Sequence, residues 1–213
     1  KDYSTVVYAR KGELLRVYLN GDEQYFFPPD SGFVLPEKLQ QCIIAYEDRN
    51  FYVHPGIDPL AVIRALYQNI RAGAIVSGAS TITMQLARMV ERRPRTLWQK
   101  LIEMIWALKI EVHFNKRDIL RLYVQHAPYG GNIIGVEAAQ HRYFNTPFSQ
   151  MTWGQAALLA VLPNAPGSFT PTRQAEKLLC NSNALLRTLF GEAIIDIRRL
   201  VSSALECIPS SRF

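Results

Sequence analysis

Two kinds of apolar pattern follow one another along the chain. Residues 5–8 and 14–19 are rich in β-branched, aromatic and leucine residues, and turn-forming pairs follow them at Lys11–Gly12 and Asn20–Gly21. This arrangement predicts two short strands joined as a β-hairpin. Pro and Gly residues at 28–32 then interrupt the chain. We therefore expect a β appendage before the second pattern begins.

From residue 36 onward, apolar residues recur every three or four positions, as they do on the buried face of a helix. Side chains that can cap a helix stand before three of these segments, at Asp58, Thr96 and Thr152. The helices that this spacing predicts cover residues 36–47, 59–70, 82–90, 97–112, 116–126, 156–162, 172–190 and 192–206. The pattern is typical of a mainly α fold.

The length of 213 residues suits one domain with a small appendage. We expect a β appendage or linker at 1–35, a helical domain at 36–190, and a C-terminal segment at 191–213 without assignment. The three cysteines are too few for a disulfide framework. Cys42 falls on an apolar stripe, so we expect it to be a small buried hydrophobe.

The formal net charge of +6 favours an anionic partner, which by charge alone is a nucleic acid, an acidic lipid surface or a phosphorylated substrate. A solvated basic face without a partner is the alternative. No run of about 18 or more apolar residues occurs, and the residues from Lys1 onward do not have the pattern of a signal peptide. We expect any membrane anchor of the natural protein to lie outside this sequence.

Several polar side chains gather around the end of the predicted helix 36–47. Glu47 lies on its apolar side, and Asp48 and His54 follow closely. Burial raises the pKa of a carboxyl group, as a general acid or base at neutral pH requires. The alternative is a helix-end carboxylate that pairs with Arg49 or caps a turn.

Two further groups of polar residues follow along the chain. Ser80 or Thr81 leads a loop into the next helix, and a simple N-cap would explain either residue. Lys100 and Glu103 lie three residues apart and share a helix face, where an exposed surface ion pair is the common arrangement.

Together these segments resemble the motifs of a known enzyme family. Residues Glu47–Gly56 have the order E-D-R-x-F-x-x-H-x-G, and Gly78–Gln85 have G-x-S-T-I-T-x-Q. Lys100–Glu103 matches part of R-K-x-x-E, and Lys116–Gln125 resembles K-x-x-I-L-x-x-Y-L-N. These motifs are similar to those of the peptidoglycan glycosyltransferases, glycosyltransferase family 51 of the class A penicillin-binding proteins, and their variants look closest to the 1C type.

The resemblance implies a lysozyme-like, bilobal helical domain that polymerises lipid II into β-1,4-linked glycan strands and releases undecaprenyl diphosphate. It implies that Glu47 is the general base and that Glu103 is the second catalytic acid. Glu103 is also the candidate ligand for Mg²⁺ or Mn²⁺, and no organic cofactor is implied. The residues that it implies for substrate binding are Asp48, Phe51, His54, Ser80, Thr81, Gln85, Arg88 and Lys100, with Arg95 as a further cation near the leaving group.

The implied partners are lipid II, the growing glycan strand and the membrane surface, without nucleic acid. A transpeptidase domain or other cell-wall synthesis proteins are further candidate partners, and the implied location is the periplasmic face of the bacterial inner membrane. Residues 59–76 have a composition suited to the membrane interface, with apolar residues beside Arg64 and Arg71. An ordinary amphipathic core helix has the same periodicity, so both interpretations stay open.

The chain departs from the family pattern at several places, namely Ala79, Met84, Gln99, Gln125 and Asn181–Asn183. Two other functions stay open, and the departures favour the second of them. One is a lysozyme-like glycoside hydrolase or lytic enzyme, which also uses a glutamate in a helical cleft. The other is a non-catalytic module that binds membrane or cell-wall partners.

Overall fold

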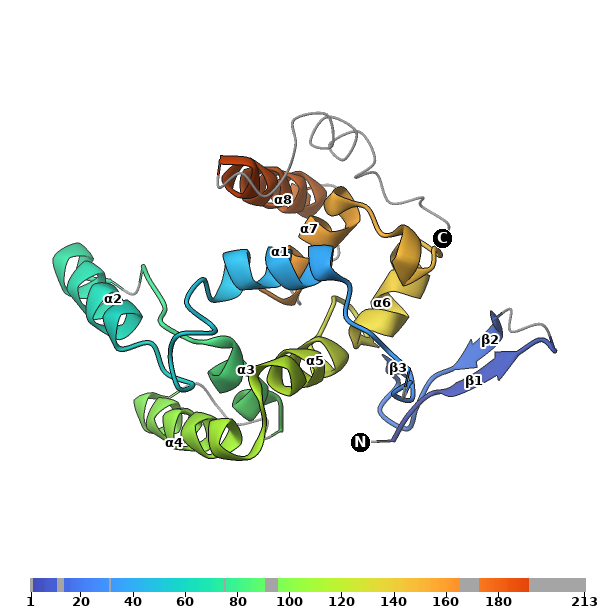
Figure 1. The fold of residues 1–213 in the computed structure, drawn as a ribbon, viewed down its shortest axis with the longest axis horizontal. Coiled ribbons are helices and arrows are strands. Elements are labelled where there is room, and N and C mark those ends of the chain that lie inside the picture. The colour runs from blue at the N-terminus through green and yellow to red at the C-terminus, as the bar shows by residue number, and fades with distance from the viewer. Residues whose placement is uncertain are drawn as a thin grey trace. The chain divides into compact units, whose positions relative to one another are not determined.

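The computed structural model describes residues 2–10, 14–30, 32–74, 76–90, 96–164 and 173–191. Eight α-helices and four short strands lie in these residues, which confirms the mainly α fold with an N-terminal hairpin (Figure 1). The chain forms two compact units, one of residues 1–46 with 124–213 and one of residues 47–123. The expected divisions near residues 35 and 190 stay predictions. The predicted turn at Lys11–Gly12 and the predicted helix at 192–206 lie outside the described residues.

The first unit contains all four strands. Strands β1 (Thr5–Tyr8) and β2 (Leu14–Tyr18) pair antiparallel, as predicted. Strands β3 (Tyr25–Phe26) and β4 (Ile133–Ile134) form a parallel pair that the sequence pattern did not predict. Two residues are too few to show an alternation of apolar and polar positions, so the periodicity carries no signal there.

The first unit also contains helices, of which α7 is buried along nearly its whole length. These helices are α1 (Glu37–Glu47, of which Glu47 belongs to the other unit), α6 (Val136–Tyr143), α7 (Trp153–Val161) and α8 (Arg173–Gly191), with 3₁₀ turns at Phe148–Gln150 and Leu162–Asn164. Helix α8 packs on α7 through leucines such as Leu185 and Leu189. Cys42 of α1 is fully buried, as expected, and burial raises the pKa of its thiol.

The second unit carries the helices that follow Glu47. They are α2 (Pro59–Ala72), α3 (Ile82–Val90), α4 (Leu97–His113) and α5 (Lys116–His126), whose residues from Val124 onward belong to the first unit. Helix α3 is buried from Ile82 to Ala87 and packs against α4 (Figure 1). Asp58 caps α2 by accepting a hydrogen bond from the Ala61 amide at 3.0 Å, as predicted.

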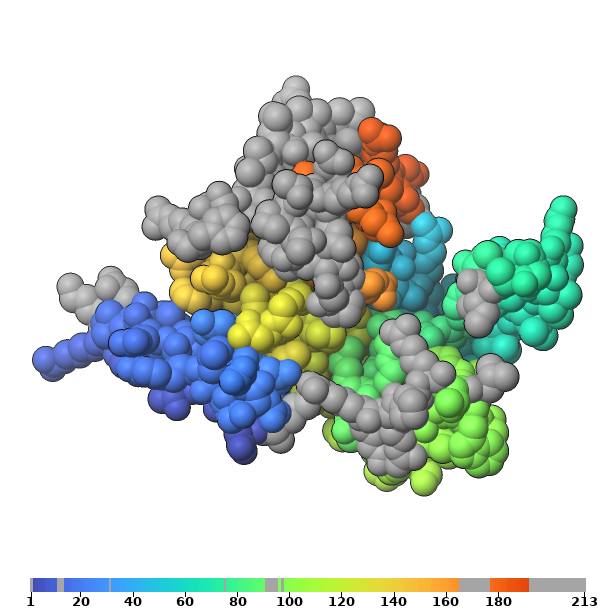
Figure 2. Space-filling model, turned by 180° about the vertical axis from the view of Figure 1, so that it is seen from behind, coloured from blue at the N-terminus to red at the C-terminus, as the bar shows by residue number. Residues whose placement is uncertain are grey.

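Helix α2 exposes most of its apolar side chains. Leu60 is 74% exposed and Ile70 73%, whereas Ala65 is the helix's one buried residue. In the space-filling view α2 is the teal segment at the right, with much of its surface uncovered (Figure 2). The alternative of an ordinary core helix is therefore not supported. Among the described residues, no helix combines the length and the hydropathy that a bilayer crossing requires.

We predict that Thr152→Ala lowers the free energy of unfolding by about 1 kcal/mol. The Thr152 hydroxyl accepts from the Gln155 amide at 3.2 Å, and the Gln155 side chain accepts from the Thr152 amide at 3.1 Å. The substitution removes the first of these bonds at the start of α7. Denaturant unfolding followed by circular dichroism measures the loss. Thr152→Ser keeps the hydroxyl and should stay near the parent, and equal losses in both variants would contradict the capping role.

Candidate active site

Glu47, the last residue of α1, begins the second unit, and its side chain meets helix α3. The Gln85 amide donates a hydrogen bond to the Glu47 carboxylate at 2.7 Å, and the Tyr123 hydroxyl reaches the Gln85 carbonyl oxygen at 3.4 Å. Gln85 and Tyr123 are buried, whereas Glu47 is partly exposed. Glu47 is therefore held from its buried side and keeps a solvent-accessible side.

The pKa of the Glu47 carboxyl is raised, chiefly because burial disfavours its charged form. The negative charge of Asp48 raises it further, while the Gln85 hydrogen bond and the positive charge of Arg88 lower it. The net direction is that expected for a group that exchanges protons near neutral pH. Arg88, predicted to bind substrate, thus also acts on Glu47.

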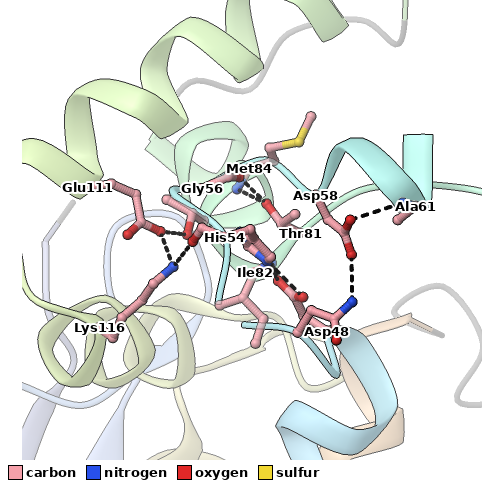
Figure 3. A network of polar contacts seen from close by, with 12 residues as sticks. Asp48, His54, Gly56, Asp58, Ala61, Thr81, Ile82, Met84, Glu111 and Lys116 are labelled. Carbon is pink, nitrogen blue, oxygen red and sulfur yellow. Dashed lines mark hydrogen bonds and ion pairs between the residues drawn. The ribbon is translucent and has the colours of Figure 1, made fainter. Parts of the chain in front are cut away.

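Asp48 and His54 form a buried pair beside Glu47. The Nε2 atom of His54 lies 2.9 and 3.0 Å from the two carboxylate oxygens of Asp48. Asp48 also accepts the Ile82 backbone amide at 3.1 Å, which ties the loop after α1 to the start of α3 (Figure 3). Because both side chains are buried, they are placed to fix this loop.

The start of α3 is held by Thr81 rather than by Ser80. The Thr81 hydroxyl accepts from the Met84 amide at 3.2 Å and donates to the Gly56 carbonyl oxygen at 2.6 Å. Of the two possible caps in the sequence, the structure therefore selects Thr81. The Ser80 hydroxyl makes a different hydrogen bond.

That contact comes from Lys100 on α4. The Lys100 ammonium donates to the Ser80 hydroxyl at 2.6 Å and to the Glu103 carboxylate at 2.9 Å. Glu103 is buried, so this ion pair is not the exposed surface pair that its spacing commonly indicates. The segment from Ser80 to Gln85 thus contacts Lys100 at one end and Glu47 at the other.

Burial divides the predicted site residues into two groups. The partly exposed group, which a substrate can touch, contains Glu47, Ser80, Arg88 and Lys100. The buried group contains Asp48, Phe51, His54, Thr81, Gln85 and Glu103. Phe51 is 0% exposed, so its position supports a packing role behind the site instead of direct substrate contact.

The described residues do not fit a metal held by the protein alone. No group of three or more His, Cys, Asp or Glu side chains comes together among them. The Glu103 carboxylate, the candidate ligand, is paired with the Lys100 ammonium at 2.9 Å. Lys100 therefore already places a positive charge where a cation would bind Glu103.

Two departures from the family motifs are accommodated without strain. Ala79 is not among the described residues with positive φ, as its side chain requires. Met84 is fully buried and packs in the core. Arg95, the further candidate cation, lies outside the described residues.

Glu111 and Lys116 were not among the predicted site residues. Glu111 accepts a hydrogen bond from the Thr83 hydroxyl at 2.6 Å and one from the Lys116 ammonium at 2.8 Å. These contacts join three helices, and no spacing within one helix reveals them. The one available signal is that Lys116 opens the fourth motif.

Comparisons with known proteins find chains of similar sequence. The family model described as transglycosylase matches residues 30–190. Penicillin-binding protein 1C of Escherichia coli (strain K12) is 38% identical over 189 residues, which are 89% of this chain and 24% of that protein. Penicillin-binding protein 1A of Aquifex aeolicus (strain VF5) is 40% identical over 190 residues, which are 89% of this chain and 26% of that protein. The chain spans about a quarter of the length of these curated relatives.

A solved structure has a similar fold. The crystal structure of penicillin-binding protein 1A from Haemophilus influenzae matches 100% of this chain and 22% of its own chain, with a TM-score of 0.53. The sequence identity is 20%, so this likeness concerns the fold alone.

We predict that the Glu47 carboxyl titrates above the usual range of a glutamate, because burial disfavours its charge. Gln85→Leu and Arg88→Met should each raise its pKa further, since both remove a group that favours the carboxylate. Arg88→Lys keeps the positive charge and should leave the pKa near that of the parent. Carbon-detected NMR of the glutamate carboxyl groups measures all four proteins. A parent value in the usual range, or a lower value in Gln85→Leu, would contradict this account.

Proposed function

The chain belongs to the transglycosylase family, and from this premise we propose that it polymerises lipid II into β-1,4-linked glycan strands and releases undecaprenyl diphosphate. The observation that carries the proposal is the segment Ser80–Gln85, which contacts both a carboxylate of raised pKa and a cation. Gln85 holds Glu47 at 2.7 Å, and Ser80 accepts the Lys100 ammonium at 2.6 Å. A proton acceptor and a partner for a departing phosphate are what this transfer requires.

In the proposed reaction Glu47 is the general base. Its carboxylate takes the proton from the 4-hydroxyl of the acceptor sugar, and that oxygen attacks the anomeric carbon of the donor. The bond between this carbon and the pyrophosphate oxygen breaks, and its electron pair leaves with the lipid pyrophosphate. Attack from the opposite face converts the α-linked donor into a β-1,4 linkage. Glu47 is partly exposed, as contact with a substrate hydroxyl requires.

Lys100 and Arg88 are the proposed partners of the departing pyrophosphate, whose negative charge grows as the bond breaks. Glu103 orients the Lys100 ammonium through their 2.9 Å contact. This contact uses the carboxylate that the expected Mg²⁺ or Mn²⁺ would need. No step of the proposed reaction is therefore assigned to a metal.

The positive charges of Lys100 and Arg88 favour glycosyl transfer over hydrolysis as the proposed reaction. A lysozyme-like glycosidase acts on a sugar–sugar bond and has no pyrophosphate to neutralise. Incubation with lipid II should therefore yield glycan polymer, while finished peptidoglycan should stay intact. Cleavage of peptidoglycan would support the hydrolase instead, and inertness toward both substrates would support a non-catalytic binding module.

We infer that the proposed enzyme works at the membrane surface, since lipid II stays in the bilayer. The exposed apolar side chains of α2, together with Arg64 and Arg71, suit an interface between acyl chains and phosphates. The proposed location is the periplasmic face of the bacterial inner membrane. A transpeptidase domain or other cell-wall synthesis proteins are the proposed protein partners, and no nucleic acid is involved.

We predict that Glu47→Gln lowers the rate of lipid II polymerisation by about a hundredfold or more, because the amide cannot accept the proton. The fold should persist, since the side chain keeps its size. Glu37→Gln on the same helix changes an exposed carboxylate and serves as the matched control. Electrophoresis of labelled glycan chains measures the rates. Full activity in Glu47→Gln would remove Glu47 from the reaction.

We predict that Ile63→Ser with Ile70→Ser weakens binding to phospholipid vesicles by about tenfold or more, because two apolar side chains leave the bilayer interface. Leu15→Ser, on the exposed hairpin, is the matched control. Arg64→Gln with Arg71→Gln should weaken binding to phosphatidylglycerol vesicles and have little effect on phosphatidylcholine vesicles. Vesicle co-sedimentation measures each protein. Unchanged binding in the double isoleucine variant would place the membrane contact elsewhere.

A further inference from the structure

A second polar cluster lies behind the candidate active site, formed by Thr83 on α3, Glu111 on α4 and Lys116 on α5. Glu111 accepts the Thr83 hydroxyl at 2.6 Å and the Lys116 ammonium at 2.8 Å. Lys116 also donates to the backbone carbonyl oxygen of His54 at 2.7 Å (Figure 3). Its ammonium lies 4.5 Å from the centre of the Phe51 ring. The cluster therefore joins three helices to the loop that carries Asp48 and His54.

The same loop is packed directly against Glu111. Gly56 has φ +87°, a conformation that favours glycine, and a Cβ atom there would lie 2.9 Å from Cγ of Glu111 and 3.1 Å from the Ala107 carbonyl oxygen. On its other side, the Gly56 carbonyl oxygen accepts the Thr81 hydroxyl at 2.6 Å. The loop is thus held between α4 and the start of α3.

The ion pair in this cluster is largely buried. The Glu111 side chain is 10% exposed and the Lys116 side chain 20%. Apolar residues of similar volume often stabilise a protein as well as a buried ion pair does, so stability alone is a weak reason for charges at this place. An apolar pair, however, cannot donate a hydrogen bond to His54. The specific contribution of Lys116 is therefore to hold the His54 carbonyl group in place through this hydrogen bond.

We propose that Glu111 and Lys116 are positioning residues for the transfer reaction, an inference that rests on the proposed function. Glu111 fixes the Lys116 ammonium, and Lys116 fixes the His54 backbone. The His54 ring then meets Asp48, the residue after Glu47. The pair thereby holds the general base in place relative to Ser80, which precedes α3, and to Lys100 on α4. Neither residue of the pair contacts the reacting atoms.

The first test is Lys116→Met, which keeps an unbranched side chain over Phe51 and removes the ammonium. We expect the turnover number to fall by about ten- to a hundredfold, because a displaced base is misaligned with the acceptor hydroxyl. The KM for lipid II should change less than about twofold, since Lys100 and Arg88 are untouched. Lys116→Arg keeps a donor and should recover part of the turnover. Arg117→Met, an exposed neighbour, is the control and should match the parent.

A second variant separates positioning from stability. Lys116→Met alone leaves the Glu111 charge buried without its partner, which destabilises the fold. Adding Glu111→Gln removes that charge, so the melting temperature should rise toward the parent value while the turnover number stays low. Recovery of both melting temperature and turnover in the double variant would overturn the proposal.

Hydrogen exchange gives a readout that does not need catalysis. The Val53 amide donates to the Asn50 carbonyl oxygen at 2.8 Å within this loop, and its exchange should be faster in Lys116→Met and in the double variant. Exchange at the parent rate in both variants would refute the positioning role. If the parent protein fails to polymerise lipid II, the proposed function fails, whereas the exchange result still decides whether Lys116 holds the loop.

Discussion

The carboxylate of Asp48 accepts hydrogen bonds from two parts of the chain that are far apart in sequence. It meets the His54 ring within its own loop and the Ile82 amide at the start of α3. A buried carboxylate is strongly destabilising unless such donors surround it. The loop conformation and the start of α3 are therefore formed together, and each requires the other. Because Glu47 directly precedes Asp48, the hydrogen bonds of Asp48 also fix the position of the Glu47 backbone.

In the unit 47–123, buried residues around that carboxylate position other residues that are partly exposed and can contact a substrate. Buried side chains such as Thr81, Gln85 and Glu103 make hydrogen bonds that aim the partly exposed Ser80, Glu47 and Lys100. Gln85 holds Glu47 directly, and Glu103 holds Lys100, which in turn contacts Ser80. A site built in this way is preorganised before any substrate arrives, as electrostatic catalysis requires.

The sequence alone predicted most helices, because α1, α3, α4 and α5 each show a repeated apolar face. It missed α6, whose N-cap Gly135 provides no capping side chain and whose short apolar run gives little periodicity. It also missed the pairing of β3 with β4, whose partners are about a hundred residues apart. The motifs include two pairs that are in contact in the structure, Glu47 with Gln85 and Glu103 with Lys100. The motifs carry no information about burial, so they could not assign Phe51 and Glu103 to the interior. They also could not predict the contact between Glu111 and Lys116, because it depends on the packing of separate helices.

The burial of Glu47 has a thermodynamic consequence. Its folded pKa is raised, so the folded protein holds the proton more tightly than the unfolded chain does. Stability from this group falls as pH rises from the ordinary glutamate range through the raised pKa. A neutral residue at position 47 would escape this penalty and, under the proposed mechanism, would remove the general base. The partly buried Glu47 carboxylate thus lowers the free energy of unfolding at the residue where the proposed reaction begins. Selection for thermostable variants will therefore tend to replace Glu47 and remove the proposed activity.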